Sequence, residues 1–184
     1  MRHLKYHEQK LMKKVNLYDW QDERSQSEAT IINRFQLKDR TEYIKYKKLV
    51  IGTQKFVNQL KDLPTNDPVR IELTQKLLEK LYHMGLIPER DTSLLDIKER
   101  LTVAMLCSRR LPTLMVKLKM AQKMADAVKF IKDGHVTIGP KIITDPALLV
   151  TRNFEDHITW APHSKIRKNI AEFNNKKDDY DFTR

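Results

Sequence analysis

Residues 109–143 constrain the fold more than any other part of the chain. Apolar side chains recur there at helical spacing in two short patterns, residues 111–118 and residues 121–131. Alanines at three positions of the second pattern would let two helices approach closely. The segment therefore predicts a pair of short, tightly packed helices.

A β-hairpin is predicted directly after this helix pair. Gly134 can end the second helix, and residues 135–138 then have the β-branched alternation of a strand. Gly139-Pro140 predicts a turn, and residues 141–143 predict the returning strand. Residues 157–160 predict a further strand.

Positive charge is concentrated in the same segment. The 184-residue chain has 35 Lys+Arg against 24 Asp+Glu, a net charge of +11. Residues 109–143 contain eight basic and two acidic residues, so that about a fifth of the chain carries +6. Such a concentration favours a polyanionic partner, and nucleic acid is the first candidate.

The rest of the chain predicts mainly helices. Residues 4–20 predict an amphipathic basic helix, residues 21–28 a polar stretch without one, and residues 41–63, 68–84 and 94–105 further helices. Thr41 is the expected cap of the first of these three, Asp67-Pro68 opens the second, and Gly85 ends it.

These patterns predict an α+β, mostly helical protein. We expect an N-terminal helical region at residues 1–107, two packed helices on a small β-sheet at residues 108–160, and a C-terminal tail at residues 161–184 that begins as a helix and frays.

Signals for catalysis, metal binding and membrane insertion are weak. Cys107, the single cysteine, is best interpreted as a buried apolar residue, because nothing adjacent except arginine could activate its thiol. His3 and His7 have metal-ligand spacing but no evident third ligand. The N-terminus has no continuous apolar stretch for a signal peptide or a membrane span. We expect no enzymatic activity, cofactor, metal, membrane contact or small-molecule substrate.

Several motifs in residues 109–160 resemble the RNA-binding domain named after ribosomal protein S4. They are R-R-L-P at residues 109–112, the alanine-rich second helix, Gly134-His135-Val136 and Gly139. Three positions depart from that pattern: Lys119 stands where glycine is frequent, Lys123 where a Ser or Thr cap is frequent, and Val128 where arginine is frequent.

Motifs along nearly the whole chain are similar to the S4-like proteins of the U3 small nucleolar ribonucleoprotein. They are H-E-Q-K-L-x-K-K-V at residues 7–15, L-x-K-L-Y-x-M-G-L at residues 78–86 and D-P-A-x-L-V-T-R-N-x-E-D at residues 145–156. The resemblance implies a nucleolar protein that helps U3 small nucleolar RNA pair with pre-ribosomal RNA for small-subunit processing. It also implies two protein partners, a Brix-domain protein and a large phosphoprotein scaffold.

The candidate RNA-binding residues are the basic side chains of the S4-like segment. They are Arg109, Arg110, Lys117, Lys119, Lys123, Lys129, Lys132, His135 and Lys141. The two arginines offer planar forks for phosphate, and the lysines act as point charges. Each lysine could equally be ordinary solvated surface, the arginines could form structural pairs with acids such as Glu99 or Asp126, and His135 could contact RNA or not.

Two other functions remain open from the sequence. A structural protein of the small ribosomal subunit could have the same fold, whereas an RNA-modifying enzyme would need a second domain for which the chain has no space. If the arginines contact RNA, replacing Arg109 and Arg110 with Glu should weaken RNA binding and leave folding intact.

Overall fold

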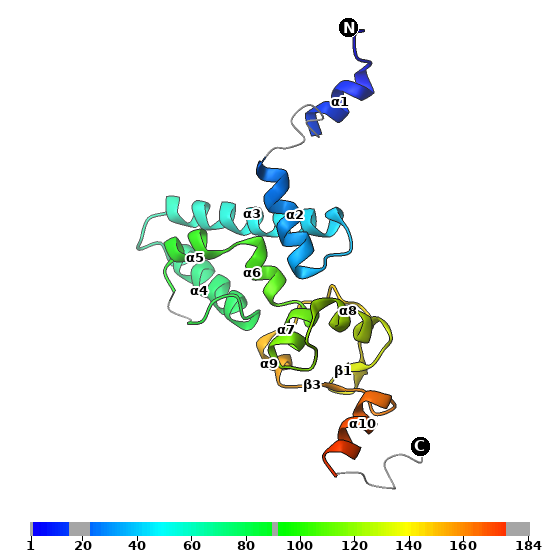
Figure 1. Cartoon of the computed structure of the whole chain (residues 1–184). Helices are drawn as coiled ribbons and strands as arrows, with labels where there is room; N and C mark the ends of the chain where they lie inside the picture. Colours follow the sequence, from blue (N-terminus) through cyan, green and yellow to red (C-terminus); the bar gives the residue numbers. More distant parts are fainter. Residues whose placement is uncertain (1, 15–22, 90–91, 176–184) are drawn as a thin grey trace.

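The computed structural model describes residues 2–14, 23–89 and 92–175 (Figure 1). Helices make up the N-terminal part of the chain, and a small antiparallel sheet with short helices follows. The predicted fold class, α+β and mostly helical, is confirmed.

The N-terminal region contains helices that vary widely in length. They are α1 (Tyr6–Lys14), α2 (Glu23–Phe35), α3 (Arg40–Asp62), α4 (Pro68–His83), α5 (Leu94–Arg100) and α6 (Val103–Ser108). The predicted boundaries of α4 are confirmed: the Asp67 carboxylate accepts a hydrogen bond from the Val69 N–H at 2.9 Å, and Gly85 leaves the helix at φ +72°.

Three local predictions differ from the structure. Helix α2 begins inside the segment interpreted as a polar stretch without a helix. Asp39, and not Thr41, caps α3, and its side chain makes no cap hydrogen bond. The pattern at residues 94–105 is divided between α5 and α6, because the Thr102 hydroxyl accepts from Met105 N–H and starts a new helix. Of the helix expected at residues 4–20, α1 accounts for residues 6–14, and residues 15–20 lie outside the described part.

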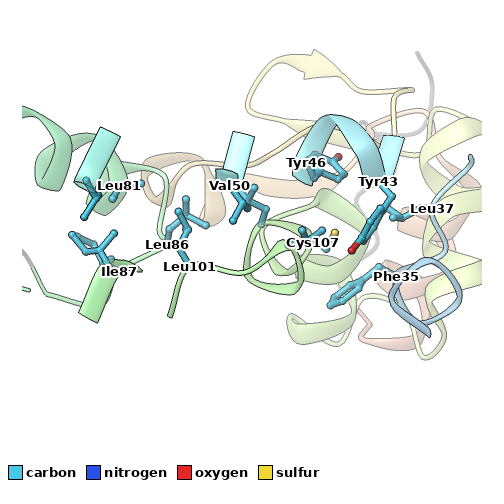
Figure 2. Packing of buried hydrophobic residues seen from close by; sticks show 14 residues of the cluster. Phe35, Leu37, Tyr43, Tyr46, Val50, Leu81, Leu86, Ile87, Leu101 and Cys107 are labelled. Atoms are coloured by element: carbon cyan, nitrogen blue, oxygen red, sulfur yellow. The ribbon is translucent and has the colours of Figure 1, made fainter. Parts of the chain in front are cut away.

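The first hydrophobic core lies between α3 and the helices that cross it (Figure 2). Tyr43, Tyr46 and Val50 of α3 are buried, and Leu149 from the later part of the chain packs against the same cluster. Cys107 is fully buried in this core, and burial raises the pKa of its thiol to about 11. The thiol is therefore protonated at neutral pH and serves as a small apolar group, as predicted.

The S4-like segment begins with α7 (Leu111–Lys117) and α8 (Met124–Lys132), which pack against each other. Strands β1 (Val136–Ile138), β2 (Lys141–Ile142) and β3 (Ile158–Trp160) form an antiparallel sheet with the order β2-β1-β3. The predicted hairpin, the third strand and the left-handed Gly134 at φ +72° are all confirmed.

A second hydrophobic core lies between these two helices and the sheet. Leu111, Ile131 and Val136 are fully buried, and the Phe130 and Trp160 rings pack edge to face with their centroids 5.6 Å apart. The short helix α9 (Arg152–Glu155) precedes β3, and α10 (Lys165–Phe173) begins the C-terminal tail. None of the described helices is long and apolar enough to span a membrane.

Candidate RNA interface

Three of the predicted RNA-binding lysines gather at the turn between α7 and α8. Lys117 is the last residue of α7, Lys119 lies in the turn, and Lys123 is the N-cap residue of α8. All three side chains are exposed. We call these three residues the turn cluster, and their ammonium groups are available to an anionic ligand.

The backbone of Lys119 is strained. Its φ is +59°, in the left-handed region that costs a residue with a Cβ about 1–2 kcal/mol. Glycine adopts this conformation without that cost, and glycine is frequent at this position in the S4-type pattern. The chain therefore places a lysine where glycine would be less strained, which suits a functional role for this side chain.

The other predicted lysines lie away from the turn cluster. Lys129 and Lys132 occupy the last turn of α8, where positive side chains also stabilise the negative end of the helix dipole. With a rise of 1.5 Å per residue, the two ends of α8 are about 13 Å apart. Lys141 is exposed on the edge strand β2. The predicted surface is therefore spread along the helix and is not one compact patch.

Arg110 is buried, with 1% of its surface exposed. Its Nη1 donates to the Phe35 carbonyl oxygen at 3.0 Å, and its Nη2 donates to Glu42 Oε1 at 2.8 Å. Tyr46 also donates its hydroxyl to Glu42 Oε1, at 3.2 Å. The guanidinium thus joins the start of α7 to α2 and α3.

Arg109 is also buried, and it takes different partners. Its Nη1 lies 2.8 Å from Glu155 Oε2, and its Nε and Nη2 donate to the Val150 carbonyl oxygen at 3.3 and 3.0 Å. The guanidinium also lies against Gly85, where a Cβ atom would come within 2.7 Å of Arg109 Cζ. Gly85 is therefore needed both for its left-handed backbone and for this close approach.

These positions correct the interpretation of the two arginines as RNA ligands. Both guanidinium groups are directed to protein partners, so the structural alternative describes them, although with Glu155 and Glu42 in place of Glu99 or Asp126. We therefore remove Arg109 and Arg110 from the exposed RNA-binding surface. Their double replacement by Glu is now expected to disrupt folding, because it would bury new carboxylates beside Glu155 and Glu42.

His135 lies between α8 and β1 and is half-buried. Its backbone N–H donates to the Phe130 carbonyl oxygen at 2.9 Å, and its carbonyl oxygen accepts from Ala161 N–H at 2.8 Å. Its buried Nδ1 has no hydrogen-bond partner within the described residues. The proposed contact of His135 with RNA stays a prediction.

A groove of about 560 Å³ separates the N-terminal region from α8. It is lined by residues of the α2–α3 turn, the start of α3, Arg110, the later half of α8 and residues 144–147. Lys38 and Lys45 contribute side chains there beside Lys132. Sequence reasoning missed these two lysines, because only the folded arrangement, in which residues of α3 and α8 line one groove, brings them to the S4-like segment.

No group of three or more potential metal ligands occurs among the residues that the structure describes, and this holds for His3 and His7 as well. Carboxylates do line the groove, but Glu42 Oε1 already accepts hydrogen bonds from Arg110 and Tyr46. The groove therefore exposes lysine ammonium groups together with the carboxylates of Asp39 and Asp145.

Two known domain families match the chain, and the border between them lies just before α7. Residues 3–108 match the family described as the ribosomal protein S4/S9 N-terminal domain, and residues 109–157 match the S4 domain. Both arginines fall just after the division, although their side chains contact residues on either side of it.

Similar proteins cover most or all of the chain. The U3 small nucleolar ribonucleoprotein protein IMP3 of Saccharomyces cerevisiae is 42% identical over 183 residues, which is 100% of both chains. The protein of the same name from Mus musculus is 42% identical over 98% of both chains. The small ribosomal subunit protein uS4 of Picrophilus torridus is 31% identical over 78% of both chains. The chain thus combines the S4/S9 N-terminal domain with an S4 domain, and it belongs to the family of the U3 small nucleolar ribonucleoprotein protein IMP3.

Proposed function

We propose that this protein is an RNA-binding assembly factor of the U3 small nucleolar ribonucleoprotein, which promotes pairing of U3 RNA with pre-ribosomal RNA in the nucleolus. The observation that carries the proposal is the turn cluster, three exposed lysines within seven residues of an S4 domain. The full-length similarity to IMP3 proteins supports the assignment to this ribonucleoprotein particle.

The proposed mechanism is neutralisation of phosphate charge. Two RNA strands repel each other, and a surface of ammonium groups that contacts both lowers this repulsion. Side chains cannot read bases in the deep major groove of A-form RNA, so contacts to phosphates and 2′-hydroxyls suit a rigid helix pair such as α7 and α8. The reaction is annealing, and it needs no catalytic group.

The runner-up is a structural protein of the small ribosomal subunit. The similarity to uS4 supports it, but that similarity is lower in identity and covers less of the chain than the similarity to IMP3. Sedimentation separates the two ideas: an assembly factor travels with precursor particles, whereas a structural protein stays with the mature subunit. Partnership with a Brix-domain protein and a large phosphoprotein scaffold belongs to the preferred proposal.

The experiment replaces the turn cluster in the full chain, as Lys117→Gln, Lys119→Gln and Lys123→Gln together. We expect affinity for an RNA duplex, measured by fluorescence anisotropy, to fall about tenfold, and the slope of log K against log salt to decrease by about two to three. The rate at which the protein anneals two complementary labelled strands should fall in parallel.

A matched variant controls for net charge. Lys48→Gln, Lys55→Gln and Lys98→Gln remove three exposed lysines from α3 and α5. If this control loses as much affinity as the turn-cluster variant, the assignment of the surface is wrong.

Lys119→Gly distinguishes the effect of the Lys119 charge on RNA binding from the effect of its backbone strain on stability. It relieves the left-handed strain, so the free energy of unfolding should rise by about 1 kcal/mol while RNA affinity falls. A protein that became more stable and bound RNA as before would show that the Lys119 charge has no part in binding.

A further inference from the structure

The groove between the N-terminal region and α8 has the size of a ligand site. Its volume of about 560 Å³ lies inside the range of roughly 300–1,000 Å³ that small-molecule sites occupy. Its walls come from both matched domains, since Lys38 and Lys45 belong to one and Val128 and Lys132 to the other. A ligand held there would contact both domains at once.

Three cations line this groove from separate segments. Lys38 lies in the α2–α3 turn, Lys45 on α3 and Lys132 at the end of α8, and all three are exposed. No ion pair of these lysines is present among the described residues. Their charges are thus free to meet an anion such as phosphate.

The groove also contains acceptors, which limits the kind of ligand. Glu42 is occupied by Arg110, but Asp39 and Asp145 add carboxylates to the lining. Asp145 Oδ1 accepts from Ala147 N–H at 2.8 Å, which leaves its other oxygen available. Carboxylates repel a bare phosphate and accept hydrogen bonds from hydroxyl or amino groups. A lining of this mixed kind suits a ligand that has both an anionic group and hydrogen-bond donors.

A buried donor on the wall of the groove has no partner. Arg110 lines the groove although it is 1% exposed, so it lies at the bottom. Its Nη1 and Nη2 are used by Phe35 and Glu42, but its Nε has no hydrogen-bond partner within the described part of the chain. Buried polar atoms are nearly always satisfied, so this unpaired Nε–H is an unusual feature of a residue that lines the groove.

We propose that this groove holds one unstacked ribonucleotide of the bound RNA. Its phosphate lies among Lys38, Lys45 and Lys132, its ribose and base donate to Asp39 or Asp145, and the base packs on the apolar Val128 side. A regular A-form helix keeps its bases stacked, so only an unpaired nucleotide can enter. This proposal rests on the proposed RNA-binding function, and it names the feature of RNA that the protein selects.

The test compares two labelled RNA hairpins that differ by one unpaired nucleotide in the stem. Full-length protein should bind the bulged hairpin at least tenfold more tightly than the regular one. Lys38→Glu with Lys45→Glu should abolish this preference, since it reverses two charges in the groove. The control, Lys48→Glu with Lys55→Glu, makes the same change of charge on exposed positions of α3 that do not line the groove. It should preserve the ratio of the two affinities.

A second variant fills the groove without a change of charge. Val128→Trp should remove the preference for the bulged hairpin and retain binding of the regular one, with folding checked by circular dichroism. The triple turn-cluster variant should weaken binding of both hairpins and keep their ratio. This separates the groove from the turn cluster.

Three outcomes would overturn the proposal. One is wild-type protein that binds both hairpins equally, and another is a groove variant that keeps the wild-type ratio. The third is a polyglutamate peptide that binds wild type and not the groove variant while RNA binding is unchanged, which would reassign the groove to an acidic protein segment. Failure of wild type to bind either hairpin would instead refute the proposed function itself.

Discussion

Arg109 and Arg110 are neighbours in the sequence, yet each takes its partners from a different distant segment. Glu155 is 46 residues from Arg109, and Glu42 is 68 residues from Arg110. A local pattern of two adjacent cations contains no information about such partners. Planar guanidinium forks suit buried carboxylates as well as phosphates, so residue type alone did not separate the two roles.

Replacing Arg110 tests its structural role. Arg110→Ala leaves the Glu42 carboxylate without its cation and the Phe35 carbonyl oxygen without the Arg110 donor, and loss of one partner from a buried pair costs about 3–5 kcal/mol. We expect the free energy of unfolding, measured by urea titration, to fall by that amount.

The control for this prediction is Lys117→Ala, which removes an exposed cation of α7. Its effect should stay within about 0.5 kcal/mol. A loss below 1 kcal/mol for Arg110→Ala would mean that the buried pair contributes little to stability.

At the scale of elements, the helices and strands that could be predicted are those defined by residues close together in the sequence. The helix pair, Gly134, the hairpin and the Asp67-Pro68 start of α4 each depend on residues close together in the sequence, and each was predicted. Helix α2 was missed because its first half is polar and its apolar residues, such as Ile32 and Phe35, come late. Tertiary packing on α3 stabilises it, and that packing is not a local property.

Gly85, which follows α4, and Gly52, which lies inside α3, give opposite predictions. Gly85 follows α4 at φ +72° and its missing Cβ leaves space for Arg109, whereas Gly52 lies inside α3 with nothing within 4 Å of an added Cβ. Gly85→Ala should destabilise the protein by about 1–2 kcal/mol through left-handed strain. Gly52→Ala should stabilise it by about 0.5–1 kcal/mol through helix propensity.

Thermal or urea unfolding of both glycine variants, each beside wild type, measures these changes. A Gly85→Ala protein as stable as wild type would mean that the backbone after α4 can relax and that Arg109 can move without loss.

At the scale of the molecule, polar contacts join the two matched domains. The Tyr46 hydroxyl lies 3.2 Å from the Ala147 carbonyl oxygen as well as from Glu42 Oε1, so its one proton is shared between two acceptors, and burial raises the pKa of this hydroxyl. Arg152 donates to the Ile87 carbonyl oxygen at 2.5 Å, and its Cζ lies 4.2 Å from the centroid of the Tyr82 ring. With Arg109 and Arg110, these contacts surround a shared apolar core.

This coupling predicts one cooperative unfolding transition. Trp160 lies on β3 and packs against the second hydrophobic core, whereas most helical residues lie before this core in the sequence. Trp20 lies outside the described residues, and Trp20→Phe leaves Trp160 as the single tryptophan of the chain. The urea midpoints from Trp160 fluorescence and from helical circular dichroism should then coincide. Two separate midpoints would show that the domains unfold independently.

The candidate site was predicted in part. The exposed lysines of the S4 domain follow from composition, because long charged side chains rarely lie fully buried. Lys38 and Lys45 could not be found in this way, since about 90 residues separate them from Lys132 and only the assembled fold makes them neighbours. A surface built from two domains is a property of their packing.

The border between the two matched families lies beside the two buried arginines that connect the domains. It falls between residues 108 and 109, immediately before Arg109, which packs on Gly85, and Arg110, which donates to Phe35 and Glu42. All three of these contacted residues precede the border. A fragment cut at this border would expose two guanidinium groups and leave the Glu42 carboxylate without its cation. A chimera that exchanges the S4 domain between relatives should therefore keep Phe35, Glu42 and Gly85, which contact these arginines from the N-terminal domain.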